Sequence, residues 1–281
     1  MDSGLWMLNR MTQNQQDQVF GKYRGKVTQT EDPLNLGRIQ VKVAAITDNK
    51  SVWAMPCTPY AGKDIGFFTI PPVDTNVWVE FEGGDVRYPI WSGCFWGENE
   101  LPQKAQVRKP EQVQVFKTDG ATLTISNQDN NKNLTIEVEN PLVEKPLKMV
   151  FNSEGIEINN NNKTTVNLKA ETIEIKNGTN STIIIAKDKI HLKESNIAIN
   201  LTNQSIELQS SPATLTLKTS SGIELKNNPA IAKLTTSGIE LSSTPATVEI
   251  AATGIELSNP IGNIKLSPAG VNINNGALQV T

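Results

Sequence analysis

The sequence from residue 156 onward repeats a short unit in which one polar residue separates two aliphatic residues. The first aliphatic residue of the unit recurs every 16 or 17 positions, and a second series lies between these, so the true period is about eight residues. So short a unit buries too little apolar surface to fold alone, and neighbouring units must stack into a solenoid. The first series begins at Ile156, Ile173, Ile190, Ile206, Ile223, Ile239, Ile255 and Val271, and the second includes Val166, Ile183, Ile197, Leu215, Ala232, Val248 and Ile264.

Alternation within each unit predicts short β-strands with one face inward and the other in water. In the stretch from Ile223 to Lys226, Glu224 and Lys226 are expected to point outward. No 3.6-residue periodicity indicates a helix. The outward carboxylates indicate a solvated face and not a calcium site, because no Gly-Asp calcium-turn motif accompanies them.

Four glycines introduce the later units at a fixed position, directly before an inward aliphatic residue. Glycine at such a position is typical of a corner that needs positive φ or a close approach of two chain segments. We therefore expect β-helix corners at Gly222, Gly238, Gly254 and Gly270.

Eight residues are too few for one face of a single-chain β-helix, in which a turn needs roughly 18 residues or more. Three chains wound together avoid this problem, with each octad forming one side of a triangular prism and its hydrogen-bonding neighbours lying in the other two chains. Residues 113–274 hold about 20 octads, which predicts a rod on the order of 95 Å long. Such a rod offers no concave pocket for a substrate.

The first hundred residues differ in composition, because 13 of the 15 aromatic residues lie before position 97. About five strand-like segments between residues 20 and 100 predict a small OB-fold barrel, with most of these aromatic side chains in its core. Residues 101–112 are polar, contain two prolines and are expected to be a linker to the rod at 113–281. The predicted fold class is all-β: an OB-fold barrel followed by a triple-stranded, intertwined β-helix of a homotrimer.

Charge and cysteine content exclude several classes of protein. The 26 basic and 29 acidic side chains give a formal charge of −3, without the basic excess of a general nucleic-acid binder or a polybasic membrane anchor. No apolar stretch is long enough for a membrane-spanning helix, and Asp2 stands where a signal peptide would be basic, so cytoplasmic synthesis is expected. Cys57 and Cys94 are expected to be two buried thiols.

Residues 20–100 also resemble the OB domain of VgrG proteins and of phage baseplate assembly protein V. The stretch Phe81-Glu82-Gly83-Gly84-Asp85 is specific to that domain, and Lys117-Thr118-Asp119-Gly120 resembles the start of the family's spike. Further matching residues are Asp32-Pro33, Gly37-Arg38-Ile39, Val41, Trp53, Ala61-Gly62, Gly66, Pro71-Pro72-Val73-Asp74-Thr75-Asn76-Val77, Val79, Arg87, Pro89-Ile90 and Gly93.

This resemblance implies a central spike of a contractile tail, a type VI secretion-like apparatus or another contractile injection system. The chain would assemble in the cytoplasm into a homotrimer within a phage tail-like particle. A separate baseplate hub protein would hold it, with residues 1–19 as the hub-contacting segment. On firing, the trimeric needle would puncture the target membrane mechanically.

The resemblance also implies a small conical tip protein of the PAAR-repeat kind. The octads continue almost to Thr281, and no His-x-His iron apex is present, since the sole histidine, His191, occupies an outward position in mid-rod. Tip docking by continuation of the β-ladder is therefore expected at Gly276, Leu278 and Val280.

An enzyme is not expected, and neither is a cofactor, a catalytic residue or a metal site. One histidine on the rod makes a Cys/His or Ser/His pair implausible, and Gly83-Gly84 lacks the lysine and the spacing of a phosphate loop. Two alternatives stay open. One is a trimeric β-helical adhesin or tail fibre, and the other is an OB-fold nucleic-acid-binding protein, which single-stranded DNA binding at physiological salt would reveal.

Overall fold

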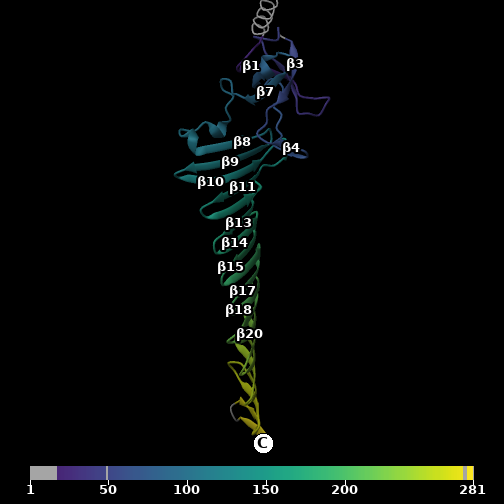
Figure 1. Ribbon diagram of the computed structural model, residues 1–281. Helices are drawn as coiled ribbons and strands as arrows, with labels where there is room; N and C mark the ends of the chain where they lie inside the picture. The colour runs from purple at the N-terminus through teal and green to yellow at the C-terminus, as the bar shows by residue number, and fades with distance from the viewer. Residues whose placement is uncertain (1–17, 49, 275–276, 281) are drawn as a thin grey trace, which may run out of the picture. The chain divides into compact units, whose positions relative to one another are not determined.

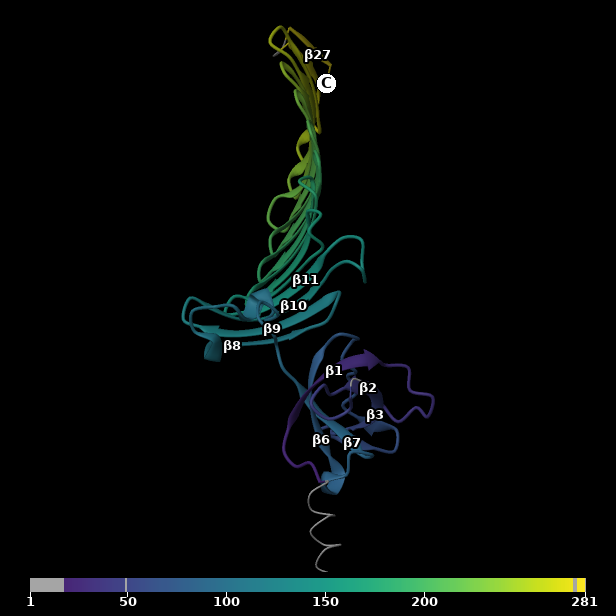
Figure 2. The ribbon, with the colours of Figure 1, turned by 90° about the horizontal axis from the view of Figure 1, so that it is seen from above.

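The computed structural model describes residues 18–48, 50–274 and 277–280. The chain divides into two compact units, the first ending at Leu101 and the second beginning at Pro102. Both are built from β-strands, with only three short 3₁₀ turns among the described residues (Figures 1 and 2). Of the N-terminal segment expected to contact the hub, residues 1–19, residues 1–17 lie outside the described residues.

The first unit contains a closed five-stranded barrel in the order β1-β2-β3-β7-β6, which Figure 2 shows curled on itself. Neighbouring strands are antiparallel except β3 and β7, which are parallel. This arrangement confirms the predicted small barrel. The strands are β1 (Tyr23–Gln29), β2 (Ile39–Lys42), β3 (Ser51–Pro56), β6 (Asn76–Phe81) and β7 (Pro89–Cys94), with a small hairpin of β4 (Ala61–Gly62) and β5 (Ile65–Gly66) and the 3₁₀ turn η1 (Glu82–Gly84).

The barrel core is mostly aliphatic, so the prediction that most aromatic side chains would fill it is wrong. Among aromatic residues 20–100, only Phe81 and Trp91 are buried. The interior of so small a barrel is filled by alternate, mostly β-branched residues of its strands. The fully buried aliphatic residues are Val27, Ile39, Val41, Val43, Ala54, Val77 and Val79.

Both cysteines are exposed, which corrects the expectation of buried thiols. Cys57 follows the last residue of β3, and Cys94 ends β7. Strand ends lie at the rim of a barrel, where side chains are reached by solvent. Position in the strand therefore outweighs the general tendency of free cysteine to be buried.

The second unit is one long ladder of twenty strands among the described residues, the number that the octad period predicts. Each strand pairs antiparallel with the next along the chain, from β8–β9 to β26–β27. Figure 1 shows the strands lying across the long direction of this unit. The strands are β8 (Val113–Lys117), β9 (Ala121–Gln128), β10 (Asn131–Val138), β11 (Leu147–Asn152), β12 (Gly155–Asn159), β13 (Thr164–Lys169), β14 (Thr172–Asn177), β15 (Ser181–Ala186), β16 (Lys189–Glu194), β17 (Ile197–Thr202), β18 (Ser205–Ser210), β19 (Ala213–Lys218), β20 (Gly222–Asn227), β21 (Ala230–Thr235), β22 (Gly238–Ser243), β23 (Ala246–Ala251), β24 (Gly254–Ser258), β25 (Asn263–Ser267), β26 (Gly270–Ile273) and β27 (Leu278–Val280).

This pairing corrects one detail of the sequence-based picture. The hydrogen-bonding neighbours of each octad are the preceding and following octads of the same chain, and not octads of two other chains. Two-residue connections such as Thr244-Pro245 between β22 and β23 are hairpin-length, which joins consecutive strands as antiparallel neighbours. At about 4.8 Å per strand, the ladder is still on the order of 95 Å long.

Candidate assembly surfaces

The face of the ladder that carries the aliphatic residues, here called the inner face, is organised in two continuous columns. Cross-strand register places the aliphatic or aromatic residues of successive strands directly opposite one another. Column A is Ile125, Leu134, Phe151, Ile156, Leu168, Ile173, Ile185, Ile190, Leu201, Ile206, Leu217, Ile223, Leu234, Ile239, Ile250, Ile255, Leu266 and Val271. Column B is Phe116, Leu123, Ile136, Met149, Ile158, Val166, Ile175, Ile183, Leu192, Ile199, Leu208, Leu215, Leu225, Ala232, Leu241, Val248, Leu257, Ile264, Ile273 and Leu278.

These columns are open to solvent in the single chain. Ile173 is 40% exposed, Ile239 is 38% exposed and Leu241 is 46% exposed. A sheet must bury its apolar face against another layer, and an exposed apolar strip of this length marks a protein interface. The inner face is therefore one side of a core that a further layer must complete.

The opposite face, here called the outer face, carries a polar column between columns A and B. Glu224, Lys233 and Glu240 lie there in direct register, so the predicted assignment of faces is confirmed. The Nζ of Lys233 lies 3.2 Å from a carboxylate oxygen of Glu240, and the Nζ of Lys265 lies 3.4 Å from one of Glu256. Such surface ion pairs contribute up to about 1 kcal/mol each, so they keep the face soluble more than they hold the ladder together.

His191 lies in the same polar column, paired in register with Asn200. Its Nδ1 contacts the side-chain oxygen of Asn200, whose amide group in turn donates to Glu207 at 3.1 Å. No group of three or more His, Cys, Asp or Glu side chains that could hold a metal ion occurs in the described parts of the chain.

Each of the four predicted corner glycines begins a strand with positive φ. The φ angles are +86° at Gly222, +151° at Gly238, +140° at Gly254 and +132° at Gly270. A Cβ atom on Gly238 would lie 2.0 Å from the carbonyl oxygen of Ile250 on the next strand. Only glycine satisfies both the backbone conformation and this close approach.

The predicted tip-docking residues lie at the last strand of the ladder. Leu278 begins β27 and is 56% exposed, and the backbone of Val280 pairs with Val271 of β26. Gly276 lies outside the described residues.

Of the expected linker, residues 101–112, the part from residue 102 onward packs on the outer face at the start of the ladder. It contains the 3₁₀ turns η2 (Gln103–Ala105) and η3 (Pro110–Gln112). The Nζ of Lys104 lies 3.0 Å from Glu137 of β10, whose second cation is Lys148 at 3.6 Å. Burial raises the pKa of Glu137, but the two lysines outweigh it and lower this pKa overall. Sequence reasoning missed this contact because the segment has no periodic pattern.

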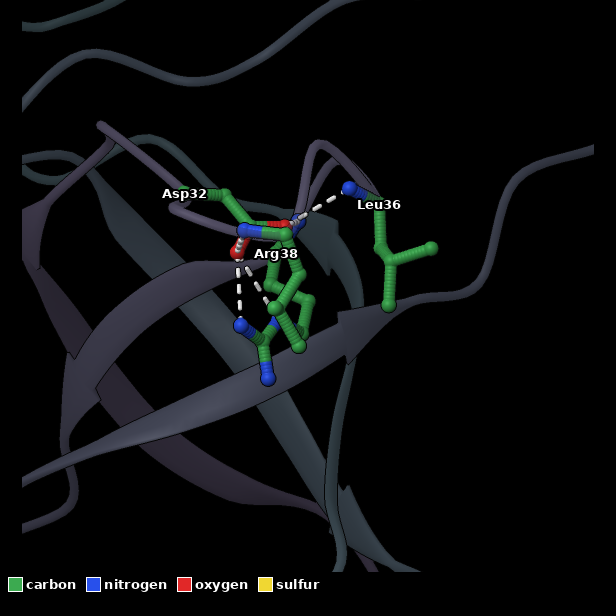
Figure 3. A network of polar contacts seen from close by, with 4 residues as sticks. Asp32, Leu36 and Arg38 are labelled. Carbon is green, nitrogen blue, oxygen red and sulfur yellow. Dashed lines mark hydrogen bonds and ion pairs between the residues drawn. The ribbon is translucent and has the colours of Figure 1, made fainter.

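One loop of the barrel is organised by a single carboxylate, shown in Figure 3. Asp32 accepts hydrogen bonds from the backbone N–H groups of Leu34 and Leu36 at 3.0 and 2.8 Å, and from Nε and Nη2 of Arg38 at 3.0 and 2.7 Å. The Arg38 guanidinium, assisted by these amides, holds the pKa of Asp32 well below its usual range. The network fixes a loop from which Leu34 and Leu36 project, 61% and 51% exposed.

A second group of exposed apolar side chains surrounds the β4–β5 hairpin of the barrel. Phe68 is the most exposed of them at 79%. The others are Tyr60, Ile65 and Phe67. These side chains lie outside the barrel core and form an exposed apolar surface.

Comparison with known families supports the resemblance seen in the sequence. Residues 23–96 match the type VI secretion system/phage-baseplate injector OB domain, and residues 196–279 match the phage baseplate V C-terminal trimerisation domain. The two matched segments fall on the barrel and on the later part of the ladder, and together cover more than half of the chain. The chain belongs to the VgrG and phage baseplate V family.

A curated spike protein is similar to part of this chain. The type VI secretion system spike protein VgrG5 of Pseudomonas aeruginosa is 34% identical over 89 residues, which is 30% of this chain. The match covers only 11% of that protein. The family is one of structural spike proteins of phage baseplates and type VI secretion systems, and its trimerisation domain supports a homotrimer. No helix within the described residues is long and apolar enough to cross a membrane.

Proposed function

We propose that this chain is the non-enzymatic, trimeric central spike of a contractile phage tail-like particle, joining the baseplate hub to a tip and puncturing the target membrane. The observation that carries this proposal is the pair of aliphatic columns, A and B, left open along the whole inner face. Three such faces, turned toward a common axis, close a triangular prism with a continuous apolar interior.

The free energy available from this closure is large. Fully burying a Val, Leu or Ile side chain contributes about 1.5–3 kcal/mol. A column residue such as Ile239 is 38% exposed in one chain, so completing its burial contributes roughly 0.6–1.1 kcal/mol. Summed over both columns this reaches roughly tens of kcal/mol per chain, well above the ~4–15 kcal/mol cost of association. A rod held together in this way is stiff and resists dissociation, as a needle must.

We assign the barrel to the hub. Its exposed apolar loops, at Leu34, Leu36 and Phe68, provide surface for a protein partner. In this proposal the hub is a separate protein, and residues 1–19 contribute to its contact. The chain needs no cofactor, metal or catalytic residue for a mechanical function.

The far end of the ladder is the surface we assign to a tip protein. β27 pairs with β26 through Val271↔Val280 and Ile273↔Leu278, and a further strand can add to its other edge. We propose that a conical protein of the PAAR-repeat kind continues the ladder there, with Gly276, Leu278 and Val280 in the contact. Deleting residues 274–281 should abolish tip binding while leaving the trimer and hub attachment intact. A particle structure in which the rod is closed by its own residues would contradict this.

The test of the spike itself begins with the mass of the purified full chain. Light scattering should give three copies of the 30.7 kDa chain, about 92 kDa, and a folded monomer would refute the proposal. Particles should then be assembled with the wild-type chain and with a Leu241→Asp variant, which places a carboxylate on the inner face. We expect the wild type alone to occupy the particle axis and to permeabilise target cells.

The exposed aromatic side chains of the barrel favour one second candidate, binding of single-stranded nucleic acid. Tyr60, Phe67 and Phe68 could stack bases, as OB-fold proteins do. The near balance of charge argues against it, because phosphate contacts need a basic surface. Fluorescence anisotropy with labelled single-stranded DNA at physiological salt decides, and we expect no binding.

A further inference from the structure

Column B contains one residue that breaks its pattern. Among its described members, Ala232 of β21 is the only residue smaller than valine. Its register partners are Leu225 on β20 and Leu241 on β22. These two leucines are 54% and 46% exposed, more than Leu192 or Leu208 elsewhere in the column, at 36% and 40%. The alanine therefore leaves a local deficit of side-chain volume.

The deficit extends across the inner face at this level. Ala230 lies two residues before Ala232 and faces the same side, because side chains alternate along a strand. It forms a third inward column with Asn227, Ser243 and Ala246, whose side chains are small or polar. In one chain these strands line an open hollow of about 430 Å³ that also includes Leu225, Leu241 and Val248, against about 360 Å³ at the filled level of Ile183 and Leu192.

Symmetry triples this deficit. In a three-fold rod each residue and its two symmetry copies lie at the same height along the axis. Column B occupies the middle position of the three inward positions on β21 and so faces the axis. Three copies of Ala232 then meet where the other levels have three copies of a larger apolar residue. The missing methyl groups cannot be supplied by another chain, because every chain lacks them at the same level.

We propose that the trimer encloses an apolar cavity on its axis at the level of Ala232, which is dry and takes small apolar guests of the size of xenon. Leu225 and Leu241 form its upper and lower lining. An engineered apolar cavity of about 150 Å³ in another protein stays dry and binds benzene or xenon. Asn227 and Ser243 lie at the margin, in the third column, and not beside the axis. The inference rests on the homotrimer of the proposed function.

Xenon is the direct probe. Crystals of the full-length trimer, pressurised with xenon, should show one peak on the three-fold axis beside Ala232. The peak should be absent from the Ala232→Leu variant, whose side chain fills the space. A trimer whose axis at Ala232 binds no xenon, or is filled by ordered water or by neighbouring side chains, would overturn the cavity and leave the spike intact. A monomeric mass would refute the trimer and the cavity together.

Filling the cavity should also stabilise the trimer, because cavity volume is destabilising. Ala232→Leu and the smaller Ala232→Val should lengthen the half-life of the trimer in warm SDS by about tenfold or more. Val166→Leu is the matched control, since it enlarges a column B residue at a filled level and should shorten the half-life or leave it unchanged. If both Ala232 variants shorten the half-life, the level is already fully packed and the proposal is wrong.

Discussion

Replacing Gly238 by valine should disrupt the ladder far more than any change on its outer face. The Cβ atom of the new residue would lie 2.0 Å from the carbonyl oxygen of Ile250, whereas carbon and oxygen approach to about 3.3–3.6 Å even in the close contacts of β-sheets. The two strands must therefore separate by more than about 1 Å. That separation breaks the pairing of Gly238 with Ala251 and of its neighbours.

The magnitude follows from two costs. Holding a non-glycine residue at a φ of +151° costs about 1–3 kcal/mol. Losing one or two ladder hydrogen bonds costs about 1 kcal/mol each. The sum is roughly 2–5 kcal/mol per chain, and roughly three times that in a trimer in which the same defect recurs at one height.

The assay is dissociation of the purified trimer in warm SDS, followed on a gel over time. Gly178→Val is the matched control, because Gly178 also has positive φ, at +69°, but no atom lies within 4 Å of the Cβ position. Glu240→Gln is the outer-face control and removes only a surface ion pair with Lys233. We expect Gly238→Val to dissociate fastest, Gly178→Val more slowly and Glu240→Gln like the wild type. Equal behaviour of the two glycine variants would show that the close approach to Ile250 does not matter.

Three further outcomes are expected. Leu241→Asp should prevent trimer assembly, because it buries a carboxylate at the three-fold axis, and a stable trimer by light scattering would contradict the assignment of the inner face. Arg87 lowers the pKa of Asp85 to about 2 through their side-chain hydrogen bonds. The stabilisation from this pair is therefore present above the ordinary carboxyl pKa of 3.8 and is lost as pH falls toward 2. Arg87→Ala should raise the pKa of Asp85, as measured by NMR titration. Asp32→Asn should speed hydrogen exchange of the loop amides at 34–38 without unfolding the barrel, and unchanged exchange would show that the carboxylate does not hold the loop.

The sequence was sufficient for the two-part architecture and for the faces of the ladder. Alternation in a unit such as Ile223-Glu224-Leu225 determines which side chains share a face, because the period of a strand is two. The five segments of the barrel were visible for the same reason. The Ala232 anomaly was also present in the sequence, but its effect depends on Leu225 and Leu241 being its register partners, which only the ladder shows.

Two of the three failed expectations, the aromatic core and the pairing between chains, failed because neither composition nor alternation determines position. Aromatic side chains such as Phe67 and Phe68 are apolar, yet they lie in loops that a five-stranded barrel cannot enclose. Likewise, an octad pattern is the same whether a strand pairs with its own chain or with another, since alternation carries no information about the neighbour. The signal that distinguishes the two was the length of the connections, such as the two residues Thr244 and Pro245, which are characteristic of hairpins.

Because each strand pairs with the next, insertions and deletions that keep the fold change the length of the rod in fixed steps. Columns A and B exchange order in alternate strands, with Ile239 before Leu241 in β22 but Val248 before Ile250 in β23. Loss or gain of a single residue within a strand would turn all aliphatic residues beyond it to the wrong face. Loss or gain of a whole hairpin of 16 or 17 residues preserves both columns and changes the length by two strand spacings, about 10 Å. Duplication or deletion of complete hairpins therefore changes the length of a spike of this design in steps of about 10 Å, which would match it to particles of different dimensions.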